Sequence, residues 1–267
     1  MSFFDGLDPR YRLILCDIWG CVHNGVNLYP GAADRLRGWR REGRAVVLIT
    51  NAPRTVEAVE QQLGRIGLTS DAWDGIATSG EAGIAALNQL GRPVGFLGTA
   101  ADRAVLEGKG VEIAGGREFT DLACTGLEEQ RPEPKDYTAQ LTGWAARGTV
   151  MHCLNPDRLV IRGGVPEVCA GALADIYEAL GGRVAWYGKP HAAIYEHALR
   201  LAGEPRASEV LAIGDSLQTD VLGAARMGFD CVFVTGGIHS GEPFPPDFSR
   251  QHGHGDWQPV AVVDSLG

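Results

Sequence analysis

The sequence has no stretch close to the ~20 consecutive apolar residues that a membrane-spanning helix requires, so we expect no membrane partner. It also lacks an excess of basic charge, because 24 Lys and Arg residues stand against 33 Asp and Glu residues, for a net charge of −9. Nucleic-acid-binding proteins usually present a basic face, so this balance favours a small or anionic ligand over nucleic acid. The amino-terminal residues contain neither the basic region nor the apolar segment of a signal peptide, which predicts a cytoplasmic protein.

The six cysteines form no Cys-x-x-Cys pair, which argues against a zinc knuckle and a thioredoxin-type motif. Several of them lie in apolar runs, so we expect reduced, buried thiols. Hydrophobic residues make up 45% of the 267 positions, enough for a true core, and the length allows one large domain or two modest ones.

Short continuous apolar runs predict the strands of a parallel sheet, because such strands are buried on both faces and show no alternation. The runs are Leu13–Cys16, Val46–Ile49, Val184–Tyr187, Val210–Ile213 and Cys231–Val234. Helical patterns follow them, over about 30–41, 55–66, 191–201 and 219–227. This alternation predicts βαβ units with right-handed crossovers.

The middle of the chain has strands and helices of its own, over about 80–182, and is large enough for a domain. We therefore predict a first domain formed by residues 1–79 and 183–267, and a second α/β domain, 80–182, inserted into it. One continuous large sheet is the alternative. The segment 241–258 is rich in Pro, His and Gly and is expected to be irregular.

Polar residues follow the predicted strands at the points where the strands end. Asp17 ends the first, Thr50-Asn51 follows the second, Lys189 comes shortly after the third, and Asp215 to Asp220 follows the fourth. In an open parallel sheet the carboxyl ends of the strands face one crevice, where ligands bind. Each residue alone also fits a turn, a helix cap or a solvated charge.

Carboxylates brought together in that crevice would repel one another, by roughly 4 kcal/mol for a pair about 4 Å apart at an effective dielectric near 20. A bound dication would reverse that sign, and a few oxygen ligands with open positions suit Mg²⁺. Lys189, Thr50 and Asn51 add positive charge and donors that could cradle a phosphoryl group.

The complete pattern resembles the haloacid dehalogenase (HAD) superfamily. Its successive signatures correspond to Asp17–Cys21, Thr50-Asn51, Lys189 and Gly214–Asp220. The resemblance implies an α/β fold with a Rossmann-like parallel-sheet core and an inserted α/β cap of the C2 type. Further segments resemble the NagD-type branch, subclass IIA, of sugar and nucleotide phosphatases, namely Asn155–Asp157, Gly188–Pro190 and Val234–Gly237.

By this resemblance, Asp17 is the nucleophile that forms an aspartyl-phosphate, which water then hydrolyses. A carboxylate is already ionised at neutral pH and needs no general base to attack phosphorus. The resemblance also implies that Mg²⁺ is held by the Asp17 carboxylate, the Trp19 backbone carbonyl and Asp215.

The same resemblance gives Thr50, Asn51 and Lys189 the role of binding the phosphoryl oxygens, with Lys189 also taking part in catalysis. Asp220 would orient the metal's water shell or Lys189, and Ser216 has a supporting place in the fourth signature. The expected partner is a small phosphorylated metabolite, and the resemblance allows a homodimer formed through the cap.

Trp19 departs from the family pattern, which has at this position an aspartate that protonates the leaving oxygen. General acid–base help is typically worth about 10²–10⁴-fold, and an indole cannot supply it. The enzyme could act on good leaving groups or take its acid elsewhere, with His23 as one candidate. It could instead catalyse a dehalogenase-type reaction, or bind a phosphorylated ligand without useful turnover. We favour a Mg²⁺-dependent hydrolase of small phosphorylated metabolites.

Overall fold

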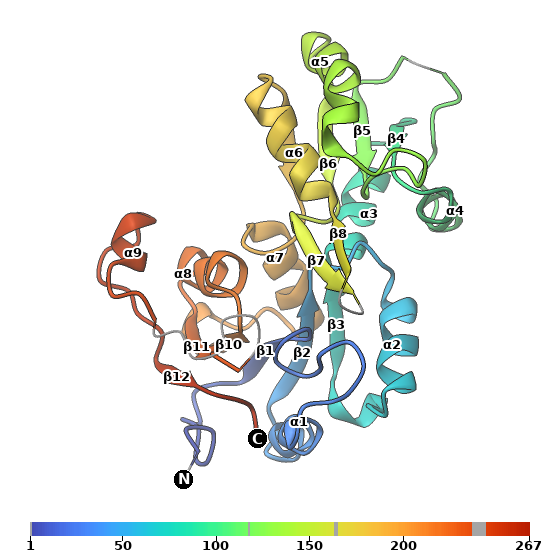
Figure 1. The fold of residues 1–267 in the computed structure, drawn as a ribbon. Coiled ribbons are helices and arrows are strands. Elements are labelled where there is room, and N and C mark those ends of the chain that lie inside the picture. Colours follow the sequence, from blue (N-terminus) through green and yellow to red (C-terminus); the bar gives the residue numbers. More distant parts are fainter. Residues whose placement is uncertain (1, 117, 163–164, 237–243) are drawn as a thin grey trace. The chain divides into compact units, whose positions relative to one another are not determined.

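The computed structural model describes residues 2–116, 118–162, 165–236 and 244–267 (Figure 1). Contacts divide the chain into two units. The first comprises Met1–Thr50, Val56–Ala77 and Lys189–Gly267, and the second comprises Asn51–Thr55 and Thr78–Gly188.

Within the described residues, six strands of the first unit form a sheet in the order β12-β11-β10-β1-β2-β3. Their bounds are β1 Leu13–Asp17, β2 Ala45–Thr50, β3 Gly75–Thr78, β10 Val210–Gly214, β11 Asp230–Val234 and β12 Ala261–Val263. β1 lies between β10 and β2 and is parallel to both. Every residue of β1 is buried, as its unbroken apolar run predicted.

Helices cover both faces of this sheet (Figure 1). They are α1 Ala32–Arg41, α2 Val56–Arg65, α7 Ala192–Leu201, α8 Leu222–Met227 and α9 Phe248–Gln251. Side chains of β1 alternate between two cores: Ile14 packs in the cluster that contains Leu36 of α1, and Leu15 packs in the cluster that contains Ile194 of α7. The sequence prediction of a doubly covered parallel sheet is confirmed.

The second unit has its own parallel sheet, in the order β4-β5-β6-β9. The strands are β4 Gly95–Leu97, β5 Asp121–Cys124, β6 Val150–Cys153 and β9 Arg183–Trp186. Its helices are α3 Ser79–Gln89, α4 Ala100–Gly108, α5 Thr138–Ala146 and α6 Ala170–Ala179. An antiparallel hairpin, β7 Leu159–Arg162 with β8 Val165–Val168, completes the unit.

The structure corrects one predicted strand. The apolar run Val184–Tyr187 was expected in the first sheet, but β9 pairs with β6 of the second, with Cys153 opposite Trp186. A continuous apolar run reports burial on both faces and does not say which sheet provides the neighbours. By contacts the second unit therefore extends to Gly188, past the predicted boundary at 182. The alternative of one continuous sheet is wrong, because these strands form separate sheets.

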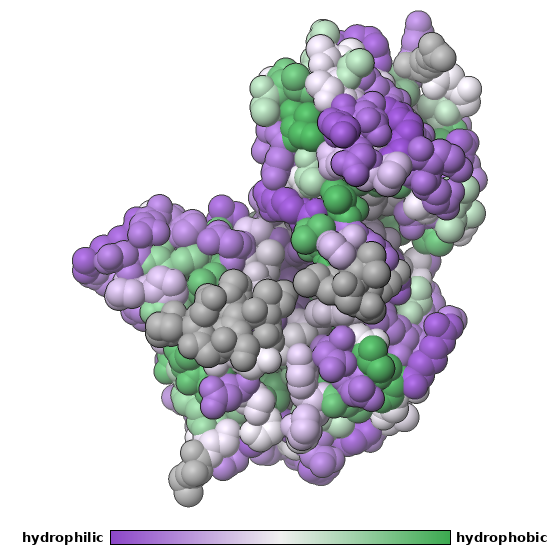
Figure 2. Space-filling view, viewed as in Figure 1, coloured by the Kyte–Doolittle hydropathy of each residue, from purple (hydrophilic) through white to green (hydrophobic). Residues whose placement is uncertain are grey.

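The structure also bears on the expected state of the cysteines, the segment 241–258, membrane-spanning helices and the surface. All six cysteines lie in the described part of the chain, are buried as expected, and are in no disulfide. The segment 244–258 contains the short helix α9, whereas residues 241–243 lie outside the described part of the chain. Among the described helices, none is long and apolar enough to cross a membrane. On the face drawn in Figure 2, apolar side chains form separate patches among hydrophilic ones, as is usual for protein surfaces.

Candidate active site

Three strand ends of the first sheet bring the predicted site residues to one edge. β1 ends at Asp17, β2 ends at Thr50, and Asp215 follows β10. Because β1 is parallel to both neighbours and Asp17 stands opposite Ile49, the residues that follow these strands emerge on the same side. This is the crevice position expected for ligands of an open α/β sheet.

Lys189 joins two of the carboxylates. Its Nζ donates to Asp17 Oδ1 at 2.5 Å and to Asp220 Oδ1 at 2.7 Å, and all three residues are buried. Residues that are 172 and 31 positions apart in the sequence are thus held by one ammonium group. Charge-assisted bonds of this kind are the strong ones, so they fix the direction of the Asp17 carboxylate.

Asp220 is set in place by the irregular turn after β10, a π-helical segment over Leu217–Val221. Its Oδ2 accepts from the Ser216 backbone N–H at 3.2 Å and from the Thr219 hydroxyl at 3.3 Å, which leaves Oδ1 for Lys189. Gly214 allows this approach, because a Cβ at that position would collide with the Asp220 side chain. Asp220 therefore contacts Lys189 directly. Its role in orienting Lys189 or the metal's water shell stays a prediction.

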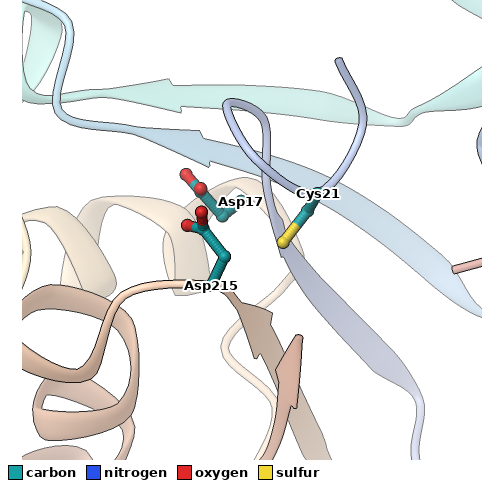
Figure 3. A group of neighbouring side chains, drawn as sticks. All are labelled: Asp17, Cys21 and Asp215. Carbon is teal, nitrogen blue, oxygen red and sulfur yellow. The ribbon is translucent and has the colours of Figure 1, made fainter. Parts of the chain in front are cut away.

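Asp17, Cys21 and Asp215 gather their ligand atoms within 4.8 Å of one another (Figure 3). The backbone of the loop after β1 comes close to Asp215 at Gly20, whose φ is +91°. A side chain at Gly20 would meet the Asp215 carboxylate, and that φ is one that other residues rarely adopt. Glycine is thus required there on two counts.

The charges of this cluster suit a dication. Burial raises the pKa of Asp17 well above its ordinary value, and the carboxylates of Asp220 and Asp215 add to the rise against the lowering effect of Lys189. Burial alone would lower the pKa of Lys189, but the two carboxylates it contacts raise it well above the usual value, so the ammonium stays charged. The oxygen ligands of Asp17 and Asp215 fit Mg²⁺, which would favour the ionised form of both.

The side chain of Trp19 lies at the surface of the same loop, 37% exposed. Its indole packs edge-on against the His23 imidazole, with ring centroids 5.1 Å apart, and fills the space beside Gly25. The indole N–H is a donor but not an acid, so the Trp19 side chain cannot protonate a leaving group. That Trp19 stands at the family's acid/base position stays a prediction.

His23 does not fit the role of replacement acid. It is buried, and its Nδ1 accepts a 2.8 Å hydrogen bond from the Gly25 backbone N–H. Burial lowers its pKa to about 4, so the ring is neutral at neutral pH. His23 therefore stabilises the loop after β1 through its hydrogen bond from Gly25, and as a neutral ring it has no proton to give as an acid at neutral pH.

The remaining predicted site residues are Thr50, Asn51 and Ser216. Thr50 is half-buried at the end of β2. Asn51 is grouped by contacts with the second unit, where its Nδ2 donates to Asp157 Oδ1 at 2.8 Å. The phosphoryl-binding roles of Thr50 and Asn51 and the Trp19 carbonyl as a metal ligand stay predictions. Ser216 supports Asp220 through its backbone.

The sequence pattern did not indicate Cys21 as a member of the cluster, although this residue ends the first signature. It also assigned no role to Gly20 or Gly214. The available signal was position: Cys21 follows Asp17 by four residues, and each glycine lies within a signature, Gly20 in the first and Gly214 in the fourth. Spacing alone could not show that the chain turns back so that the thiol faces the aspartates.

Comparison with known proteins identifies the family of this chain. The model of haloacid dehalogenase-like hydrolases matches residues 14–112, and the HAD-hydrolase-like model matches residues 186–267. A haloacid dehalogenase-like hydrolase from Brucella suis 1330 has a similar structure, with a TM-score of 0.82 and 34% identity over 98% of this chain and 97% of that chain. The chain belongs to the haloacid dehalogenase-like hydrolases.

Curated relatives indicate the branch. The ribonucleotide monophosphatase NagD of Escherichia coli K12 is 28% identical over 235 residues, which cover 85% of this chain and 88% of that protein. An acid sugar phosphatase of Staphylococcus saprophyticus is 26% identical over 87% of this chain and 90% of its own length. Within the family, the chain is a hydrolase of the NagD-like branch, subclass IIA.

Proposed function

We propose that this protein is a Mg²⁺-dependent phosphatase of small phosphorylated metabolites that works through an aspartyl-phosphate on Asp17. The observation that carries the proposal is the buried Lys189 ammonium bonded to Asp17, with Asp215 beside it. The named activities of the relatives, on ribonucleotides and on sugar phosphates, support the same class of substrate. Mg²⁺ bound by Asp17 and Asp215 would offset negative charge on the phosphoryl oxygens.

The residues of the chain divide the work. The Asp17 carboxylate attacks phosphorus, a new bond forms between phosphorus and a carboxylate oxygen, and the alcohol or phenol leaves. Water then attacks the aspartyl-phosphate, which releases phosphate and restores Asp17. Lys189 holds Asp17 in direction before attack and offsets the charge that develops during transfer, while Thr50 and Asn51 bind phosphoryl oxygens.

Trp19 sets the range of substrates. Without an acid at this position the leaving oxygen departs unprotonated, so its own pKa decides the rate. We expect Mg²⁺-dependent phosphate release to be faster from aryl and acyl phosphates than from alkyl phosphates. A panel of sugar, nucleotide, aryl and acyl phosphates measures this, and equal rates across leaving groups would contradict the assigned effect of Trp19.

Replacing Trp19 by Asp should restore the missing acid. The variant Trp19→Asp is expected to raise kcat on alkyl phosphates, up to about 100-fold, with little gain on aryl phosphates whose leaving groups need no proton. Trp19→Asn is the matched control, because it removes the same indole volume without adding an acid. A gain of equal size in both variants would mean that the indole blocks substrate instead.

The same substrate panel also tests two alternative functions. A phospho-ligand-binding protein without useful turnover is favoured by one observation, the indole at the acid/base position. It predicts saturable binding of phosphorylated ligands and no phosphate release. A dehalogenase-type reaction needs no metal, so it leaves the Asp215 carboxylate beside Asp17 unexplained. The cytoplasmic location and the homodimer also stay predictions.

A further inference from the structure

Arginines are concentrated at the amino end of the first sheet. Five of the ten residues from 35 to 44 are arginine, and they lie in the second half of α1 and in the turn before β2. Arg12 comes directly before β1, whose first residue, Leu13, stands opposite Ala45 at the start of β2. Asp17 ends the same strand, about 16 Å from Arg12 at the usual rise of a strand. The proposed reaction uses none of these arginines.

Two adjoining cavities form an open groove at this end of the first unit. Their volumes are about 600 and 480 Å³, and they share Gly43 and Arg44 as lining residues. The charged residues along the groove are Arg12, Arg37, Arg40, Arg41 and Arg44 together with Glu42, Asp71 and Asp74. This lining has a net charge of +2 in a chain of net charge −9, so the groove is locally positive.

Carboxylates and carbonyls fix the direction of three of the arginines. Arg37 Nε donates to Asp71 Oδ2 at 2.7 Å. Arg40 Nη2 donates to Asp74 Oδ1, also at 2.7 Å. Arg44 donates to three backbone carbonyls of the amino-terminal segment. Because a guanidinium has five N–H donors, Arg37 and Arg40 keep donors for a ligand beyond those that hold them in place.

Each cavity also contains an exposed arginine that is not held in this way. Across the described residues, the Arg41 guanidinium forms no hydrogen bond and no ion pair. Arg12 has no salt bridge there either, and the nearby Glu209 carboxylate, whose pKa it helps to lower, is bonded to Arg206. The groove therefore combines oriented guanidinium groups with two that an anion could contact without displacing a carboxylate.

The lining favours phosphate charge over an aromatic or apolar ligand. Its one aromatic residue, Tyr11, is buried and offers no ring for stacking. The planar guanidinium matches two oxygens of one phosphate, so arginines spread over two adjoining cavities suit several linked phosphates. Nucleic acid would need a wider basic face than one groove of an acidic chain.

We propose that the groove lined by Arg12, Arg37, Arg40, Arg41 and Arg44 binds the phosphate chain of a small polyphosphate anion. Inorganic tripolyphosphate and nucleoside triphosphates share this chemistry. The groove lies at the opposite end of β1 from Asp17, so it is separate from the proposed catalytic site. The proposal holds whether or not the protein is a phosphatase.

Calorimetric titration of the intact protein with tripolyphosphate in metal-free buffer tests the proposal. Without a dication, the Asp17 and Asp215 carboxylates repel an anion, which keeps the catalytic site out of the measurement. We expect saturable one-to-one binding that weakens as salt is added. Arg41→Ala and Arg12→Ala should each raise Kd about tenfold, because each removes charged donors from the ligand. Unchanged affinity in both variants overturns the proposal.

Arg65→Ala is the matched control. Like Arg41, Arg65 is exposed in the last turn of its helix and forms no hydrogen bond or ion pair among the described residues, but it lies outside the groove. This variant should keep the affinity, and a tenfold loss in it would overturn the proposal by showing that only overall charge matters. Thermal unfolding checks that all three variants are folded.

Two further ligands identify what the groove recognises. A nucleoside triphosphate should bind with an affinity similar to that of tripolyphosphate, because the shared phosphate chain makes the contacts. If the nucleoside triphosphate alone binds, the base or sugar is recognised and the proposal is wrong. Inorganic phosphate should bind much more weakly than tripolyphosphate, and equal affinity would contradict recognition of a linked chain.

Discussion

Each unit of the molecule contains a buried aspartate on a parallel sheet, and the two aspartates have opposite electrostatic surroundings. Asp121 of β5 accepts from the Arg92 guanidinium at 2.8 Å, from the Thr120 hydroxyl at 2.6 Å and from His152 Nε2 at 3.0 Å. His152 Nδ1 in turn lies 2.7 Å from the Tyr187 hydroxyl. Burial alone would raise the pKa of Asp121, but these bonds outweigh it and lower the pKa.

Asp17 is arranged differently. It shares its ammonium partner with Asp220, it has Asp215 beside it, and its pKa is raised well above the ordinary value. A satisfied network such as that of Asp121 is explained by the stability of the second unit. A cluster whose carboxylates are still short of positive charge is explained by something that binds there, which is why perturbed pKa values concentrate at functional sites.

The largest expected effect is on activity, and it should distinguish Asp17 from Asp121. Asp17→Asn should lower Mg²⁺-dependent phosphate release at least about 10⁴-fold, because the amide is a poor nucleophile. Asp121→Asn is the matched variant in the second unit and should keep most of the activity while it lowers the melting temperature. Phosphate release and thermal unfolding on both variants measure this. Equal losses of activity would remove the distinction.

The second prediction concerns the shared cation. Lys189→Met leaves Asp17 and Asp220 buried without their common partner, and breaking a buried pair in this way costs about 3–5 kcal/mol of unfolding free energy. Adding Asp220→Asn to Lys189→Met should recover part of that loss, because one uncompensated charge is removed. Denaturant unfolding measures both. If the double variant is no more stable than the single one, repulsion between the carboxylates is not the cause.

The third prediction concerns pH and the loop after β1. His23 has a folded pKa of about 4, against an ordinary value of 6.5, so its contribution to stability is fully present above pH 6.5. That contribution is lost as the pH falls toward 4, because the unfolded chain takes up the proton first. Between pH 7.5 and 4.5 the parent should lose about 2.5 kcal/mol more than His23→Asn, whose side chain can still accept from Gly25. Equal pH slopes in the two proteins would contradict a buried neutral ring.

The smallest expected effect concerns Arg92, the exposed ion-pair partner of Asp121 in the second unit. Arg92→Ala removes an ion pair to Asp121 whose arginine side chain is 54% exposed, so solvent already screens it. We expect a loss of about 1 kcal/mol or less in unfolding free energy. Denaturant unfolding of Arg92→Ala and of Lys189→Met compares the unfolding free energy lost with an exposed cation and with a buried one. A loss as large as that of Lys189→Met would show that exposure is a poor guide here.

Much of the fold followed from local pattern. Unbroken apolar runs predicted β1, β2, β10 and β11, because strands covered on both faces need apolar side chains at every position. The end of each run marked where polar residues emerge, which is why Asp17 and Asp215 could be placed at one edge before any coordinates. The strand β9 was assigned to the wrong sheet because its sequence carries burial but no information on its neighbours.

The sequence by itself determined which residue types stand at the strand ends and that their chemistry suits a phosphoryl group and a dication. The tertiary structure decided the pairings: Lys189 between Asp17 and Asp220, the Cys21 thiol turned toward the aspartates, and His23 buried as a neutral ring. The physical reason is that apolar periodicity is a local property of the chain. Charge compensation and desolvation depend on atoms brought together from distant positions, and those appear only in the folded protein.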